Sequence, residues 1–179
     1  MKKMAIALSI AALSTFPAKA DVLGVYIGGQ VWDNASSGEF GESTGQQDFN
    51  LGDEQQGSFY IAVEHPVPFI PNIKVASTTL DTAGQTTLTA DFDFGGETFN
   101  EGAIVDANFD VDYVDYTLYY EIFDNGVFSF DVGITGRDFG GDVELSTASV
   151  TTPSQTTSGT ISVSEIVPML YASTQIGLV

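Results

Sequence analysis

The chain has no cysteine and few bases: its 179 residues include 5 Lys or Arg against 24 Asp or Glu, with one histidine. Without cysteine there is neither a disulfide scaffold nor a thiolate metal site. So few bases exclude a surface that binds nucleic acid by neutralising phosphates. Hydrophobic residues make up 43% of the chain, which is too many for a disordered protein and fits one folded domain.

Long apolar runs are also missing beyond the start of the chain. The first twenty residues open with two lysines, continue through an apolar run at 4–16, and end in a small-x-small cleavage site before Asp21. This pattern predicts a secretory signal peptide over residues 1–20. The run is shorter than the roughly 20 apolar residues that a membrane anchor needs.

Removal of this peptide changes the charge of the chain. It takes away three lysines and no acid, so residues 21–179 keep 24 acids against Lys74 and Arg137, a formal charge of −22. No later segment is long and apolar enough for a membrane helix. If this part of the chain enters a membrane, it must do so as strands.

Apolar residues alternate with polar or small ones in stretches rich in Val, Ile, Phe, Tyr and Thr. This alternation predicts six strands, at residues 22–33, 58–64, 72–80, 109–123, 127–138 and 160–175. Long polar segments and short turns alternate between them. Long loops on one side and short turns on the other, after a signal peptide, are typical of an outer-membrane barrel. We therefore predict an all-β fold, an antiparallel up-and-down transmembrane β-barrel over residues 21–179.

The two faces of the predicted strands differ in polarity. The expected lipid-facing residues are Tyr116, Leu118, Tyr120, Ile122, Phe128, Phe130, Val132 and Ile134. The expected lumen-facing polar residues are Glu64, Lys74, Asp115, Glu121, Asp131 and Arg137. Alternation alone leaves a second interpretation open, in which the apolar face is the core of a soluble β-protein.

The Asp124-Asn125-Gly126 segment predicts the register of the strands on either side. A three-residue loop, with Gly126 in the left-handed conformation, sets Phe123 opposite Val127. The apolar pairs that follow are Tyr120–Phe130, Leu118–Val132 and Tyr116–Ile134. The polar pairs are Glu121–Ser129, Tyr119–Asp131, Asp115–Thr135 and Tyr113–Arg137, with Glu64 opposite Lys74 across the proline-rich turn. A two-residue turn would move acids onto the apolar face, where charge is costly in lipid.

Several segments together resemble a known family. They are the glycine-rich first strand ending in Trp32, the turn at 64–68, the strand at 115–121 with its Asp-Asn-Gly turn, and the strand at 131–134. They are similar to a family of small outer-membrane β-barrel proteins of Gram-negative, often marine, γ-proteobacteria, with the plan of OmpA-like and OmpW-like barrels. The resemblance implies a structural envelope role or a narrow passive pore, and no catalytic signature.

The same resemblance implies eight strands, whereas six are readable. Six strands do not readily close a barrel. We expect either that the chain lacks its last hairpin or that residues 86–106 add two strands, turning at Gly95-Gly96. A simpler interpretation makes this segment the tall extracellular parts of the third and fourth strands.

Candidate chemistry is sparse. His65 is the only histidine and falls in the proline-rich turn, so we expect no enzyme and no cofactor; an outer-membrane enzyme is a remote alternative. Asp91, Asp93, Asp110 and Asp112 offer hard oxygen ligands for Ca²⁺ or Mg²⁺, though charge that keeps loops solvated explains them as well. The expected partners are outer-membrane lipid, lipopolysaccharide bridged by divalent cations, and the barrel-assembly machinery. The main alternative is a soluble secreted or periplasmic β-protein that binds a ligand or a surface.

Overall fold

A computed structural model describes residues 23–41, 46–147 and 156–177. The predicted signal peptide lies outside these residues. Across them the chain forms strands and no helix, and so holds no helix that could cross a membrane. The prediction of an all-β fold is confirmed.

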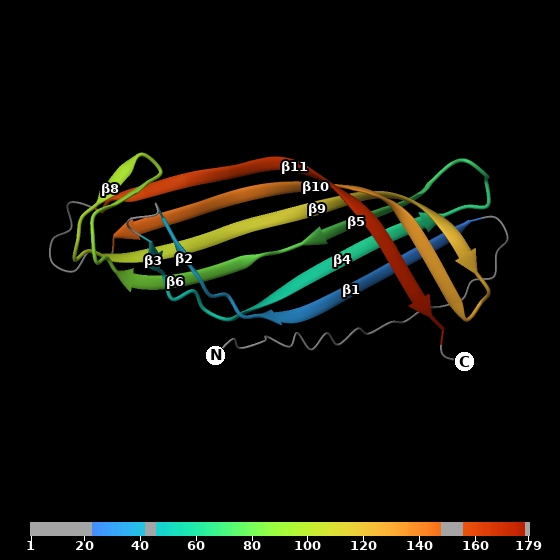
Figure 1. Ribbon diagram of the computed structural model, residues 1–179, viewed down its shortest axis with the longest axis horizontal. Coiled ribbons are helices and arrows are strands. Elements are labelled where there is room, and N and C mark those ends of the chain that lie inside the picture. The colour runs from blue at the N-terminus through green and yellow to red at the C-terminus, as the bar shows by residue number, and fades with distance from the viewer. Residues whose placement is uncertain (1–22, 42–45, 148–155, 178–179) are drawn as a thin grey trace.

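One antiparallel sheet dominates the molecule (Figure 1). Its strands follow the order β1-β4-β5-β9-β10-β11. A further strand, β6, pairs with the first part of β9, next to the part that pairs with β5. The bounds are β1 Gly24–Asn34, β4 Glu54–Glu64, β5 Asn72–Thr78, β6 Asp81–Thr87, β9 Ile104–Asp124, β10 Phe128–Thr147 and β11 Ser158–Ile176. Every pairing is antiparallel, and strands that follow one another along this path are neighbours. The predicted up-and-down order is therefore confirmed for six strands, with β6 continuing β5.

Most strands are longer than predicted. β9, β10 and β11 contain 21, 20 and 19 residues because the alternation continues into the acidic and Thr-rich segments. The pairing of β6 with the first part of β9 confirms the predicted extensions for the two ends of the segment 86–106, residues 86–87 and 104–106, and not for its middle. Residues 86–106 add no strand to the main sheet: β7 (Phe92–Phe94) and β8 (Glu97–Phe99) form a separate hairpin. Gly95 and Gly96 turn this hairpin with φ of 61° and 84°, as a tight hairpin turn requires.

The sheet has two different ends (Figure 1). At the turn end, residues 65–71 join β4 to β5 and residues 125–127 join β9 to β10. At the loop end, the small elements β2 (Glu39–Phe40), β3 (Gln47–Asp48), β7 and β8 gather over the sheet. Their apolar side chains pack on the ends of β9 and β10 as the loop-end core. This core consists of Phe49, Leu88, Phe92, Phe99, Val105, Ala107 and Leu145.

The register of β9 against β10 differs from the prediction by two residues. The apolar pairs are Tyr120–Val132, Leu118–Ile134 and Tyr116–Gly136. The inward pairs are Glu121–Asp131, Tyr119–Gly133, Thr117–Thr135 and Asp115–Arg137. A shift of two leaves every side chain on its predicted face, because side chains alternate with a period of two.

The loop itself explains this shift. The side chain of Asn125 accepts hydrogen bonds from the N–H groups of Val127 (3.0 Å) and Phe128 (2.8 Å), so the turn is wider than three residues. A bulge between Phe130 and Asp131 then returns the side chains of both strands to their predicted faces. Gly126 has φ of 80°, which confirms its predicted left-handed conformation.

The predicted pair Glu64–Lys74 is also wrong by two residues. Lys74 pairs with Ala62, because the proline-rich turn is centred one residue earlier in the chain than predicted. The side chain of Asn72 closes this turn by accepting a hydrogen bond from the backbone N–H of His65 at 3.1 Å.

Candidate functional site

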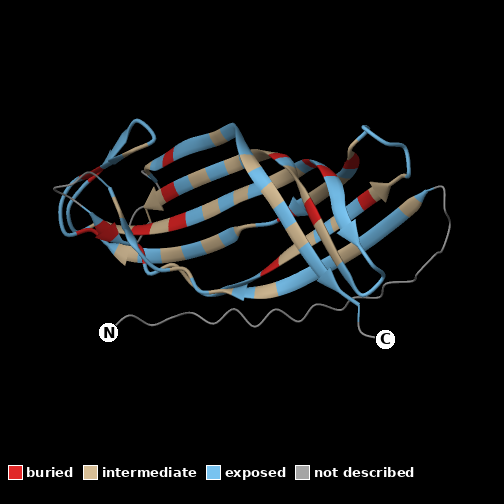
Figure 2. Ribbon diagram, turned by 45° about the vertical axis from the view of Figure 1, so that its right-hand side comes forward, coloured by how far each residue is buried: buried red, intermediate tan, exposed pale blue. Residues whose placement is uncertain are grey.

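The polar face of the main sheet is concave and inward. The ammonium of Lys74 on β5 lies 5.5 Å from the ring centroid of Tyr171 on β11, although β9 and β10 separate these strands in the sheet. Buried and exposed residues alternate along the strands (Figure 2). On the turn-end halves of β9 and β10 the buried members are polar or tyrosine: Thr117, Tyr119, Asp131 and Thr135. All six residues predicted to face a lumen occupy inward positions on their strands.

Arg137 and Asp115 form the only ion pair among the described residues. The guanidinium Nε and Nη2 each donate to one carboxylate oxygen at 2.8 Å. The same guanidinium stacks 3.7 Å from the ring centroid of Tyr113. A bidentate pair on an aromatic ring fixes both charges on the inward face.

Lys74, the other base predicted to face inward, sits among tyrosines. Its ammonium lies 4.5 Å from the ring centroid of Tyr60, on the strand next to its own. Tyr119 packs 5.6 Å from Tyr171 and donates its hydroxyl to Glu64 Oε1 at 2.7 Å. These contacts tie β4, β5, β9 and β11 together through their inward side chains.

The outward face at the turn end has the opposite character. The predicted lipid-facing residues Tyr116, Leu118, Tyr120, Ile122, Phe128 and Ile134 are all exposed, while Phe130 and Val132 are half-buried. The outward apolar belt, as we call it, continues on the other strands. It includes Val25, Ile27, Phe59, Ile61, Ile73, Ile166 and Leu170, and Leu170 is 92% exposed.

Toward the loop end, both faces of β9 exchange their character. Val105 and Ala107 point inward and are buried in the loop-end core, whereas Asn108 and Asp110 point outward and are exposed. The pairing of β9 with β10 has no register shift between residues 105 and 121, so the same positions point inward in both halves. The strand is therefore polar inside and apolar outside at the turn end, and apolar inside and polar outside at the loop end.

The loop-end core resembles the interior of a soluble protein. Phe40 stacks on Phe49 with ring centroids 4.2 Å apart, and Phe109 meets Phe40 edge-on at 5.3 Å. Phe49 and Leu145 have no exposed surface. Burial of such side chains is the usual source of stability in water.

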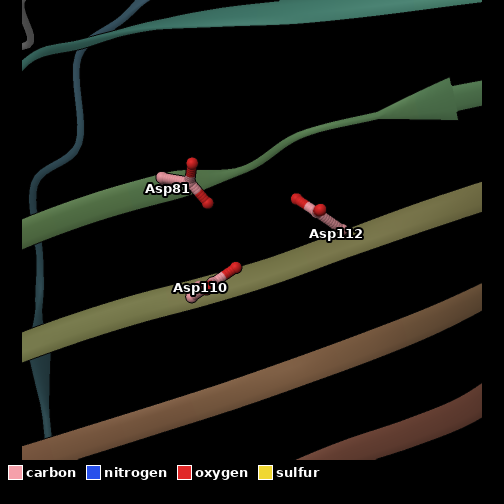
Figure 3. A group of neighbouring side chains, drawn as sticks. All are labelled: Asp81, Asp110 and Asp112. Atoms are coloured by element: carbon pink, nitrogen blue, oxygen red, sulfur yellow. The ribbon is translucent and has the colours of Figure 1, made fainter.

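Three aspartates meet on the outward face just beyond the apolar belt (Figure 3). Asp81 comes from β6, and Asp110 and Asp112 from β9, and one oxygen of each lies within 4.8 Å of the others. All three are exposed. Desolvation of its carboxyl and repulsion from Asp110 and Asp112 raise the pKa of Asp81. Carboxylates in this arrangement offer ligands of the kind that Ca²⁺ prefers.

The structure separates the four aspartates proposed as weak metal ligands. Asp110 and Asp112 lie together, whereas Asp91 and Asp93 belong to the β7–β8 hairpin and its flank. There Asp91 accepts the N–H of Glu101 at 2.8 Å and Asp93 accepts the hydroxyl of Thr98 at 2.6 Å, so both brace the hairpin. The sequence analysis did not identify Asp81. The one signal that could have done so is its position directly after the predicted third strand.

His65 holds the proline-rich turn together. Its Nδ1 accepts the N–H of Val67 at 3.2 Å, and its Nε2 lies 3.3 Å from the carbonyl oxygen of Pro71. Both ring nitrogens therefore face backbone groups of the turn, with the proton on Nε2. A hollow of about 550 Å³ lies beside this turn, lined by polar groups such as Glu64, Glu121 and Asp124 and by residues of the turn itself.

The chain matches no protein-family model, no curated protein and no solved structure.

Proposed function

We propose that this chain is an integral outer-membrane β-barrel protein with a structural role in the cell envelope. The six strands would form most of the wall of an up-and-down barrel of eight, reached by signal-peptide-directed export and the barrel-assembly machinery. The outward apolar belt would face lipid, and the inward polar face would line the interior.

The observation that carries this proposal is the exchange of polarity along β9. A soluble sheet gains stability by turning its apolar side chains inward, as the loop-end half does. The turn-end half exposes Leu118 and Ile134 and buries Thr117 and Thr135. That arrangement is favourable where lipid surrounds the sheet, and it is costly in water. The belt on β9 extends from Val114 to Ile122, close to the ~9–11 residues of a spanning strand.

The interior contacts favour a structural role over a passive pore. Lys74 lies between Tyr60 and Tyr171, and Tyr119 bonds Glu64, so side chains from four strands meet across the concave face. An interior of about eight strands is just filled by its side chains. The passive pore remains the second candidate, to be tested by conductance across a planar bilayer.

The position of the aspartate cluster supports lipopolysaccharide as a partner. Asp110 and Asp112 point outward just beyond Val114, where the belt ends. Lipid headgroups would lie at that level, and divalent cations would bridge their phosphates to these carboxylates. The main alternative function, a soluble β-protein, predicts no such partner.

The first experiment measures the gel mobility of the protein from purified outer membranes, in detergent, with and without boiling. A heat-dependent mobility is expected for a closed membrane barrel. Recovery of the protein in the soluble periplasmic fraction, with no mobility change, would overturn the proposal.

A matched pair of substitutions sharpens this test. Leu118→Arg places a base in the belt, whereas Asn108→Arg places it on the same face of the same strand at the loop end. Basic side chains cost about 2–4 kcal/mol at the lipid midplane, so Leu118→Arg is expected to block membrane assembly and Asn108→Arg to permit it. Equal assembly of both variants would favour the soluble alternative, because an exposed Leu is replaced harmlessly in water.

A further inference from the structure

The proline-rich turn exposes an unusual phenylalanine. Phe69 is 93% exposed, and its φ of 69° lies in the left-handed region, which bulky side chains rarely occupy. Among the described residues only Asn50 shares this trait without being glycine, and asparagine tolerates it well. The turn therefore holds a strained backbone in order to present a benzyl group outward.

Neighbouring groups fix this conformation. The hydroxyl of Tyr120 donates to the carbonyl oxygen of Phe69 at 3.0 Å. His65 and Asn72 brace the base of the turn through the contacts described above. Three prolines, at 66, 68 and 71, restrict the backbone further. The turn is thus organised before it meets any partner.

The chemistry of the turn fits a region with little water. Its prolines carry no N–H, and the N–H of Val67 is already accepted by His65, so few backbone donors are left. Residues 66–71 contain no charged side chain. Val67 and Ile70 are exposed beside Phe69. Unsatisfied donors and charges are costly near hydrocarbon, and this segment is largely free of them.

The turn is continuous with the outward apolar belt. Tyr120, which holds Phe69, is itself an outward residue of the belt. At the neighbouring turn, Phe123 and Phe128 lie with ring centroids 6.0 Å apart and are exposed. Aromatic residues thus mark the turn-end border of the belt on both turns, the level at which aromatic side chains meet a membrane interface.

We propose that the proline-rich turn, residues 65–71, is a membrane anchor that inserts Phe69 into the boundary between headgroups and acyl chains of the leaflet nearest the turn end. Its partner is a lipid surface. This inference rests on the proposed function and adds that the turn itself, and not only the strands, contacts lipid and sets the depth of the protein.

The test uses tryptophan as a depth reporter in the full chain. In a Trp32→Phe background, Phe69→Trp reports on the turn, and Ile134→Trp, in the middle of the belt, serves as the control. Each protein is reconstituted into phosphatidylcholine vesicles with bromines near the headgroup end or near the methyl end of the acyl chains. Shallow bromines are expected to quench Phe69→Trp more strongly, and deep bromines Ile134→Trp.

The outcomes separate the two proposals. Quenching of Ile134→Trp without quenching of Phe69→Trp would overturn the anchor and leave the membrane barrel standing. No quenching of either reporter would overturn both.

A second variant tests the anchor without a reporter. Phe69→Asn keeps a residue that accepts the left-handed backbone and removes the apolar group. Its insertion into preformed vesicles is expected to slow several-fold, with unchanged heat stability in detergent. An unchanged insertion rate, or an equal loss of stability in detergent, would overturn the anchor.

Discussion

Arg137 and Asp115 face each other across β10 and β9 and share two hydrogen bonds of 2.8 Å. One of only two bases that remain after residue 20 is therefore committed to a carboxylate on the inward face. The pair is partly buried, with side-chain exposures of 26% and 18%. It joins the two strands close to the level at which the polar and apolar faces of β9 change sides.

Replacing Arg137 with lysine keeps the charge and loses the two-pronged geometry and the stacking on Tyr113. Because lysine cannot form both hydrogen bonds in one plane, we expect a loss of about 1–2 kcal/mol in the free energy of unfolding. Urea titration of the protein folded in detergent measures it. In a double-mutant cycle with Asp115→Asn, the two losses should not add; full additivity would show that the pair is not coupled.

Gly133 lets β9 and β10 approach closely beside Tyr119. A Cβ atom added at Gly133 would overlap the carbonyl oxygen of Leu118 and the backbone of Tyr119, whereas one added at Gly140 meets nothing within 4 Å. Gly133→Ala is therefore expected to cost about 1–3 kcal/mol, and Gly140→Ala little. Equal unfolding midpoints for the two variants would contradict the close approach.

The loop-end core should be separable from the rest of the sheet. Phe49 is fully buried in it, so Phe49→Ala is expected to cost about 3–5 kcal/mol of local stability. The belt lies outside this core, so heat-dependent gel mobility should persist while the loop end becomes sensitive to protease. Simultaneous loss of both properties would show that the two halves fold as one cooperative unit.

The aspartate cluster makes the stability of the loop end depend on pH. The pKa of Asp81 is raised in the folded protein by desolvation and by repulsion from Asp110 and Asp112. The folded chain thus binds more protons than the unfolded chain between the ordinary aspartate pKa and the raised one. Stability contributed by Asp81 falls as pH rises through that window and stays constant above it. Asp81→Asn should flatten this part of the urea-midpoint profile, whereas an identical profile in the variant would contradict it.

Much of the sheet could be predicted from the sequence because alternation with a period of two identifies both strands and faces. Strand order followed from the lengths of the connections, and the parity of every belt residue on β9 was correct. Register was missed twice, at the Asn125 turn and at the proline-rich turn. In both places an asparagine side chain accepts a hydrogen bond from the backbone of the turn: Asn125 widens the first turn, and Asn72 closes the second one residue earlier than predicted. Spacing alone does not report such bonds.

The candidate site was harder to predict for a different reason. Lys74 and Tyr171 are nearly one hundred residues apart, and only the curvature of the sheet brings them together. Asp81 joined Asp110 through the pairing of β6 with β9, which required the tall strand extensions to be placed in register. The exchange of polarity has a signal in the sequence of β9. Its apolar residues change from odd positions (Val105, Ala107, Phe109) to even positions (Val114, Tyr116, Leu118) within one uninterrupted strand.

β9, β10 and β11 continue through the level where the polarity exchanges with no shift in their pairing there. Three continuous strands thus join the part proposed to lie in lipid to the part outside it. The loop-end core is built on the same strands as the belt, so in the proposed membrane its height above the lipid would be set by the length of those strands.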